Sequence, residues 1–134
     1  MARESSPPRD LGLTPWGKPF GSYTVGVEAA LAYLKEAVRR LQEAMDLEAL
    51  YLFGSHARGT ADPRSDLDLL VVARTPLPPL KRIGLVLELL QDAPVPVDVL
   101  VLTPEELDER RELPFLRGIL RGALPLYERG KEAA

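Results

Sequence analysis

The sequence predicts a domain that combines helices and strands, α/β in the broad sense and α+β in the narrower one. It has a small mixed β-sheet of about four strands flanked by helices on one side. Three observations support this prediction. Some segments carry apolar residues at every third or fourth position, as amphipathic helices do, and short apolar runs bounded by turn residues, typical of buried strands, alternate with them. The composition, 46% hydrophobic and 28% charged, is that of a globular protein.

Length and composition restrict the organisation of the chain. Its 134 residues fit one domain. Residues 1–22 contain repeated Pro and Gly without a sustained period and predict an extended arm, which leaves residues 23–134 for the domain. The absence of cysteine excludes thiol chemistry, and a net charge of −3 offers no broad basic surface for nucleic acid. No apolar run is long enough for a bilayer, so we expect a cytoplasmic protein without membrane contact.

The N-terminal half predicts one long helix and two strands. A helix capped by Ser22 or Thr24 is indicated by apolar residues spaced four and three apart. Residues 50–53 form a short apolar run that stops at Gly54-Ser55, which predicts a strand followed by a tight turn. After the polar stretch 56–65, residues 67–72 predict a second buried strand. The helical apolar positions are Val27, Leu31, Leu34, Val38, Leu41 and Met45.

The C-terminal half predicts three helices and two strands. Pro78 and Pro79 open a helix that ends near Asp92, because proline is tolerated in a first helical turn. Residues 95–102 are mostly β-branched and aliphatic and predict a strand. The sequence Thr103-Pro104-Glu105-Glu106 has the form of a capping box and starts a helix to about residue 111. A further helix at 115–121 precedes a strand at 123–128, which Pro125 places at a sheet edge.

Acidic residues interrupt two of the predicted strands. Asp66 and Asp68 are two residues apart at the start of one strand, so strand alternation places both carboxylates on one face. Asp98 is a lone acidic residue in an apolar strand, where an unpaired buried charge would be costly. Because Mg²⁺ binds carboxylates together with water and substrate phosphates, these residues predict a site for two metal ions.

The Gly54-Ser55 turn precedes these carboxylates. Glycine permits a tight turn or the close approach of a ligand, and the Ser55 hydroxyl with the exposed N–H groups of a following helix start can hold a phosphate. Taken singly, the turn could be ordinary, the Asp pair could be solvated, and Asp98 could pair with Arg or Lys. Their conjunction, in this order, favours nucleotidyl or phosphoryl transfer.

Gly54-Ser55, ten intervening residues and Asp66-Leu67-Asp68 resemble the Gly-Ser-x10-Asp-x-Asp signature of the DNA polymerase β-like nucleotidyltransferase superfamily. The resemblance covers about residues 24–130 and is closest to the minimal nucleotidyltransferases (MNT), the partners of HEPN proteins. It implies the polymerase β-like core fold, a nucleotide bound by Gly54 and Ser55, and metal ligation by Asp66 and Asp68. Asp98 falls where the third carboxylate is expected.

The same resemblance implies further roles. Asp98 would ligate the catalytic metal and assist deprotonation of the attacking hydroxyl, and Ser65 would join the nucleotide-binding set. Arg58 is added to this set as a positive charge of the motif loop, because the signature itself does not fix its identity. Arg64 lies in the same loop and could contact phosphate. The substrate would be ATP or another NTP. We assign no role to His56, the single histidine.

The implied partner is a HEPN protein, often a ribonuclease toxin, which an MNT antitoxin neutralises by adding AMP to a tyrosine hydroxyl. A hetero-oligomer is therefore expected, and a homodimer is an alternative assembly. Two other functions stay open: a binding module that masks a HEPN partner without catalysis, and a transferase acting on a small aminoglycoside-like molecule. A P-loop and an EF-hand are excluded because their motif residues are absent.

Overall fold

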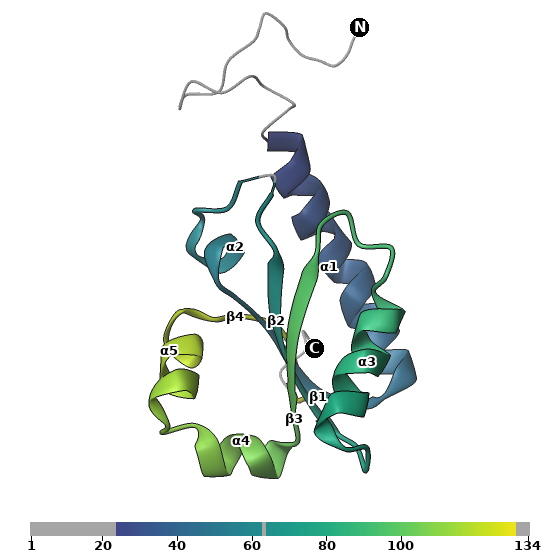
Figure 1. The fold of residues 1–134 in the computed structure, drawn as a ribbon, viewed down its shortest axis with the longest axis vertical. Coiled ribbons are helices and arrows are strands. Elements are labelled where there is room, and N and C mark those ends of the chain that lie inside the picture. The colour runs from purple at the N-terminus through teal and green to yellow at the C-terminus, as the bar shows by residue number, and fades with distance from the viewer. Residues whose placement is uncertain (1–23, 63, 131–134) are drawn as a thin grey trace, which may run out of the picture.

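A computed structural model describes residues 24–62 and 64–130, with side chains from residue 27 onward (Figure 1). The predicted arm at 1–22 lies outside the described residues. The elements are α1 (Thr24–Ala44), β1 (Asp46–Phe53), α2 (Ser55–Arg58), β2 (Leu67–Arg74), α3 (Pro79–Leu89), β3 (Val97–Leu102), α4 (Pro104–Arg110), α5 (Pro114–Gly122) and β4 (Leu124–Glu128).

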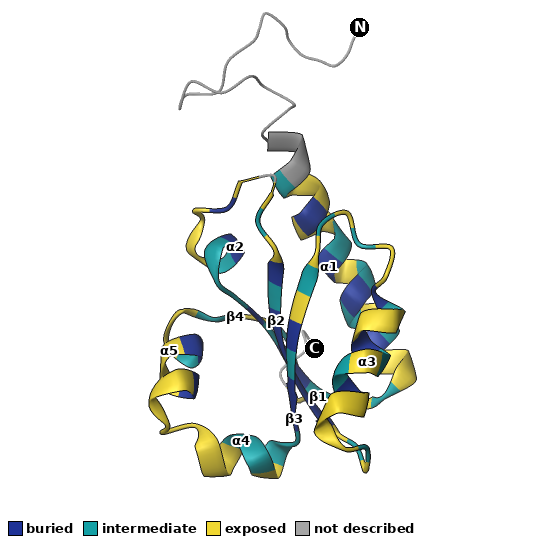
Figure 2. Cartoon of the chain, viewed as in Figure 1, coloured by how far each residue is buried: buried dark blue, intermediate teal, exposed yellow. Residues whose placement is uncertain are grey.

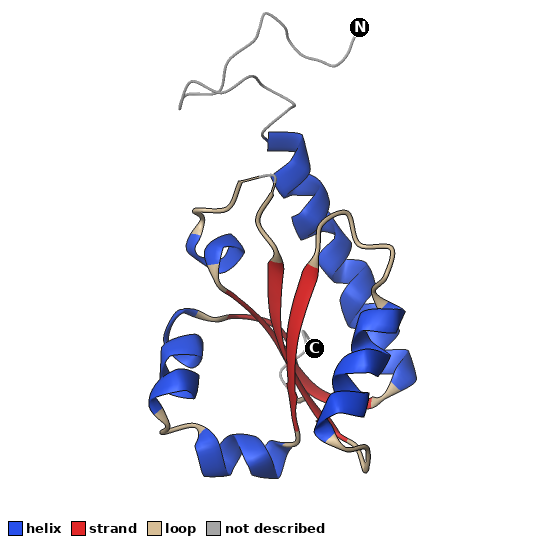
Figure 3. Cartoon of the chain, viewed as in Figure 1, coloured by secondary structure: helices blue, strands red, loops and turns tan. Residues whose placement is uncertain are grey.

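Four strands form one sheet in the order β3-β2-β1-β4 (Figure 3). Strand β1 pairs antiparallel with both β2 and β4, whereas β2 and β3 are parallel. The sheet is therefore mixed, as predicted. The parallel pair requires a crossover, which α3 supplies, and β4 occupies an edge where Pro125 can be accommodated.

Helices cover both faces of this sheet, so the prediction of helices on one side is wrong. Helices α1 and α3 pack on one face, in a cluster that includes Leu41, Leu50 and Val86. Helices α4 and α5 cover part of the other face, where Leu70 and Leu116 belong to a second cluster (Figures 1 and 2). The physical reason lies in β2: consecutive residues 69–73 are all buried, which requires cover on both sides.

Most predicted elements are confirmed, with shifted ends. Strand β1 begins at Asp46 rather than at Leu50, because Leu47 and Ala49 are already buried in the sheet. The helix start predicted after Gly54-Ser55 is the four-residue α2, which extends into the first part of the polar stretch. The capping box of α4 is confirmed, since the Glu106 N–H donates to Thr103 Oγ1 at 3.1 Å and the Thr103 N–H donates to Glu106 Oε1 at 3.0 Å. Within the described part of the chain, no helix is long and apolar enough to span a membrane.

Candidate active site at the edge of the sheet

The turn after β1 is shaped around Gly54. This residue has φ of 77° and ψ of −155°, a combination that is essentially restricted to glycine. A Cβ atom added to Gly54 would lie 2.0 Å from Asp68 Oδ2, so the backbone passes directly against this carboxylate. The sequence predicted a tight turn or the close approach of a ligand at Gly54. The structure shows the turn, and the group that lies close to Gly54 is the carboxylate of Asp68.

Asp68 and Asp98 lie opposite each other on neighbouring strands. The parallel register of β2 and β3 pairs Asp68 with Asp98, and the antiparallel register of β1 and β2 pairs Phe53 with Asp68. Because strand side chains alternate, Asp68 and Asp98 share the face on which α5 packs against Leu70. The side chain of Asp98 is exposed, so the expectation of a buried charge is wrong: Asp98 lies near the start of β3, and the buried residues of this strand are Val99, Val101 and Leu102.

Asp66 belongs to the loop before β2, which begins one residue later, at Leu67. Its side chain is exposed, and its main-chain oxygen lies 3.0 Å from Nδ1 of His56. A carbonyl oxygen can only accept, so Nδ1 of His56 carries the proton and donates. His56 is buried in α2, and its Nε2 atom has no hydrogen-bond partner among the described residues. This contact joins the Gly-Ser turn to the Asp66 loop. Sequence reasoning missed it because the acceptor is a main-chain atom.

The carboxylates influence one another electrostatically. The pKa of Asp68 is raised above its ordinary value, first by burial and then by the negative charges of Asp98 and Asp66. The nearby charges of His56 and Arg58 oppose this increase. Asp68 is thus a half-buried acid in a field of like charge, and a cation at this place would relieve the repulsion.

The donor set suits a hard cation. In residues 27–62 and 64–130, no hydrogen bond or ion pair is made to the carboxylates of Asp66, Asp68 and Asp98, while other acidic residues such as Glu36 and Asp92 pair with arginine. Carboxylate oxygens that keep room for water and phosphate are the ligands of Mg²⁺. Within the same residues, however, no three potential metal ligands are yet gathered closely enough to enclose an ion. The residue types fit Mg²⁺, and their side chains would have to converge on it.

The remaining predicted residues surround this edge. The Ser65 hydroxyl accepts from the Asp62 N–H at 2.9 Å, and the Arg64 N–H donates to Asp62 Oδ1 at 2.8 Å. The Ser65 side chain therefore orders its own loop. Arg58 and Arg64 are exposed, and the charge of Arg58 reaches Asp68.

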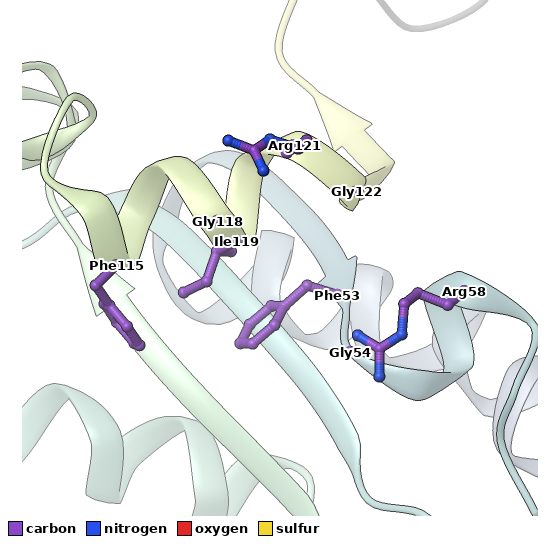
Figure 4. A pocket seen from close by; sticks show the side chains of 8 residues that line it. All are labelled: Phe53, Gly54, Arg58, Phe115, Gly118, Ile119, Arg121 and Gly122. Atoms are coloured by element: carbon purple, nitrogen blue, oxygen red, sulfur yellow. The ribbon is translucent and has the colours of Figure 1, made fainter.

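A cavity adjoins the turn on the α5 side. Its volume is about 520 Å³, within the range of small-molecule sites. Sequence reasoning missed it because its two walls, the end of β1 with α2 and the length of α5, are far apart in the chain (Figure 4). The lining residues are Phe53, Gly54, Arg58, Phe115, Gly118, Ile119, Arg121 and Gly122.

The fold and site together define a class: a small α+β domain with a Gly-Ser turn at one end of a mixed sheet, beside carboxylates that no described residue pairs with, an arrangement suited to metal-assisted chemistry on phosphates. The profile of the nucleotidyltransferase domain family matches residues 31–123, more than half of the chain. The chain belongs to this family, which confirms the predicted resemblance to nucleotidyltransferases.

Relatives agree with this membership. A protein of Methanocaldococcus jannaschii, named as a candidate protein adenylyltransferase, is 36% identical in an alignment of 91 residues, and the match covers 63% of this chain. The chain spans 60% of the length of that relative. The structure of a candidate nucleotidyltransferase from Sulfolobus solfataricus matches with a TM-score of 0.58 and 25% identity, over 84% of this chain and 95% of the other.

A more distant structural neighbour is a complex. The tri-AMPylated Shewanella oneidensis HEPN toxin with its MNT antitoxin matches with a TM-score of 0.51 and 20% identity, over 74% of this chain and 72% of that one. A toxin–antitoxin structure with AMP-PNP matches at 0.55 and 22% identity, over 72% and 73%. At these identities the likeness concerns the fold.

Proposed function

We propose that this chain is a Mg²⁺-dependent nucleotidyltransferase that moves AMP from ATP to a hydroxyl group of a partner protein. The observation that supports this most strongly is the set of free carboxylates beside the Gly-Ser turn, with Asp68 and Asp98 in register on neighbouring strands. Family membership supports the same reaction type.

In the proposed reaction the acceptor oxygen forms a bond to the α-phosphorus of ATP. The bond from this phosphorus to the bridging oxygen breaks, and pyrophosphate leaves with the electron pair. The proton of the hydroxyl passes to the carboxylate of Asp98. Bound Mg²⁺ would supply charge neutralisation at the phosphate oxygens. Asp66 and Asp68, with Asp98, would hold it.

The turn and its surroundings hold the nucleotide in this proposal. The Ser55 hydroxyl, which makes no hydrogen bond to a described residue, is available to a phosphate oxygen. Gly54 has no side chain that would separate this phosphate from Asp68. Arg58 provides a positive charge near the carboxylates, and Ser65 contributes by holding the loop that carries Asp66.

The proposed acceptor is a tyrosine of a HEPN toxin, with which the chain would form a hetero-oligomer as its antitoxin. Support comes from the fold shared with the MNT antitoxin that is bound to an AMPylated HEPN toxin. The exposed apolar side chains of Leu113 and Leu124, which lie at the two ends of α5, are available to a protein partner. We place the protein in the cytoplasm in this proposal, because its reaction consumes ATP, which is supplied there. Free carboxylates are not needed by a module that only masks its partner, so they favour catalysis.

The test is an AMP-transfer assay with the purified chain, a HEPN partner, Mg²⁺ and ATP labelled at the α-phosphate. We expect label on the partner with the wild-type chain and none with Asp66→Asn. The matched control is Asp108→Asn, the same change on an exposed position of α4, which should transfer normally. Undiminished transfer by Asp66→Asn would contradict the mechanism, and absent transfer by the wild type would favour masking.

A further inference from the structure

The cavity beside the Gly-Ser turn lies on one side of the carboxylates. Gly54 borders the cavity and also contacts Asp68. Asp98 lies on β3, the opposite edge of the sheet from β4, whereas the cavity opens over the end of β1. The row Phe53, Asp68 and Asp98 across the three strands therefore leads from the cavity wall to the proposed proton acceptor.

The cavity has an apolar wall and positive charges. Figure 4 shows Phe115 and Ile119 of α5 in a row with Phe53 of β1, and Arg58 beside Phe53 on the α2 side. Neither Arg58 nor Arg121 forms an ion pair with a residue in the described part of the chain. Aromatic surface with unpaired guanidinium groups suits a flat ring that carries phosphate.

Two glycines of α5 keep this wall open. A Cβ atom added to Gly118 or Gly122 would meet nothing within 4 Å, and neither residue has a positive φ. Glycine inside a helix is destabilising relative to alanine, and neither packing nor backbone conformation requires it here. The missing side chains instead enlarge the cavity, so their absence would benefit a ligand.

We propose that this cavity receives the nucleobase of the NTP, which stacks against Phe53 while its phosphates extend along Gly54 toward Asp68. This inference rests on the proposed function. An acceptor hydroxyl is a less suitable occupant of the cavity, because it must reach Asp98. In an in-line displacement the acceptor oxygen and the departing pyrophosphate lie on opposite sides of the α-phosphorus. The acceptor thus approaches from the β3 side, and the cavity on the Gly54 side remains for the nucleotide.

Calorimetric binding to the full chain in Mg²⁺ tests this assignment with two probes, ATP and inorganic triphosphate. Gly118→Leu fills the cavity, and Gly122→Leu fills it independently. Gly84→Leu is the matched control, because Gly84 is an exposed glycine of α3 whose added Cβ would also meet nothing. We expect both α5 variants to bind ATP roughly tenfold more weakly or worse, with unchanged triphosphate affinity, because only the base is displaced. The control should bind both probes normally.

Unchanged ATP affinity in both α5 variants would overturn the nucleobase assignment and leave the proposed function intact. Equal loss of ATP and triphosphate affinity would also overturn it, because the turn itself would then be disturbed. Thermal unfolding of each variant shows whether the fold is retained. A wild-type chain that binds neither probe would contradict the proposed function instead.

Discussion

Replacing Gly54 by alanine should have two effects, a loss of stability from backbone strain and a loss of AMP transfer from displacement of the Asp68 carboxylate. The ε-region backbone of this residue costs a non-glycine residue about 1–3 kcal/mol. The new methyl group would also lie 2.0 Å from Asp68 Oδ2, where ordinary contact is about 3.5 Å, so this carboxylate must retreat by about 1.5 Å. We therefore expect Gly54→Ala to lose about 1–3 kcal/mol of unfolding free energy and nearly all AMP transfer.

The matched control is Gly130→Ala. Gly130 also has a positive φ, of 83°, but an added Cβ there would meet nothing within 4 Å. Urea unfolding should show a loss of stability in both variants, whereas the transfer assay should fail only for Gly54→Ala. Wild-type transfer rates in Gly54→Ala would refute the reasoning, since the contact between Gly54 and Asp68 would then have no role in the chemistry.

Two further predictions concern contacts that hold the scaffold and the site together. The pKa of Glu106 is lowered, chiefly by its hydrogen bonds from Arg82 and also by the one from the Thr103 N–H. The ionised Glu106 therefore stabilises the folded state above the unfolded pKa of about 4.3, and this contribution is lost as pH falls through the folded pKa. Glu106→Gln should lower the free energy of unfolding by roughly 1–3 kcal/mol at pH 7 and remove this part of its pH dependence, as measured by urea unfolding between pH 3 and 7. An unchanged pH dependence would exclude the pair of Glu106 and Arg82 as its source. His56→Leu should lower AMP transfer, because the main-chain oxygen of Asp66 loses its hydrogen-bond donor. His56→Asn keeps a donor and should recover part of the rate. Equal rates in both variants would contradict the role of His56 in positioning the Asp66 loop.

Local signals in the sequence predicted most of the helices and strands, and they singled out the individual site residues. The capping box at Thr103 and Glu106 is complete within four residues, so α4 could be placed without tertiary information. The Gly-Ser turn and the Asp66 and Asp68 pair are similarly local. Asp98 was singled out by its place as a lone carboxylate in an apolar strand and then by the family resemblance, and the register of β2 with β3 pairs it with Asp68.

Features that depend on packing between distant segments could not be predicted. The periodicity of α5 indicates a helix but not the face of the sheet it covers, which explains the wrong one-sided arrangement and the missed cavity. The exposure of Asp98 depends on which part of β3 the helices cover, and the apolar character of the whole strand concealed this. His56 was passed over because its acceptor is the main chain of Asp66.

The central claim, nucleotidyl transfer, is tested most directly by the position of the label. The wild-type chain, a HEPN partner and Mg²⁺ would be incubated in parallel with ATP labelled at the α-phosphate and ATP labelled at the γ-phosphate. The proposed chemistry predicts that the α label becomes attached to the partner and that the γ label leaves as pyrophosphate. Transfer of the γ label to the partner would contradict it, because the reaction would then be phosphoryl transfer.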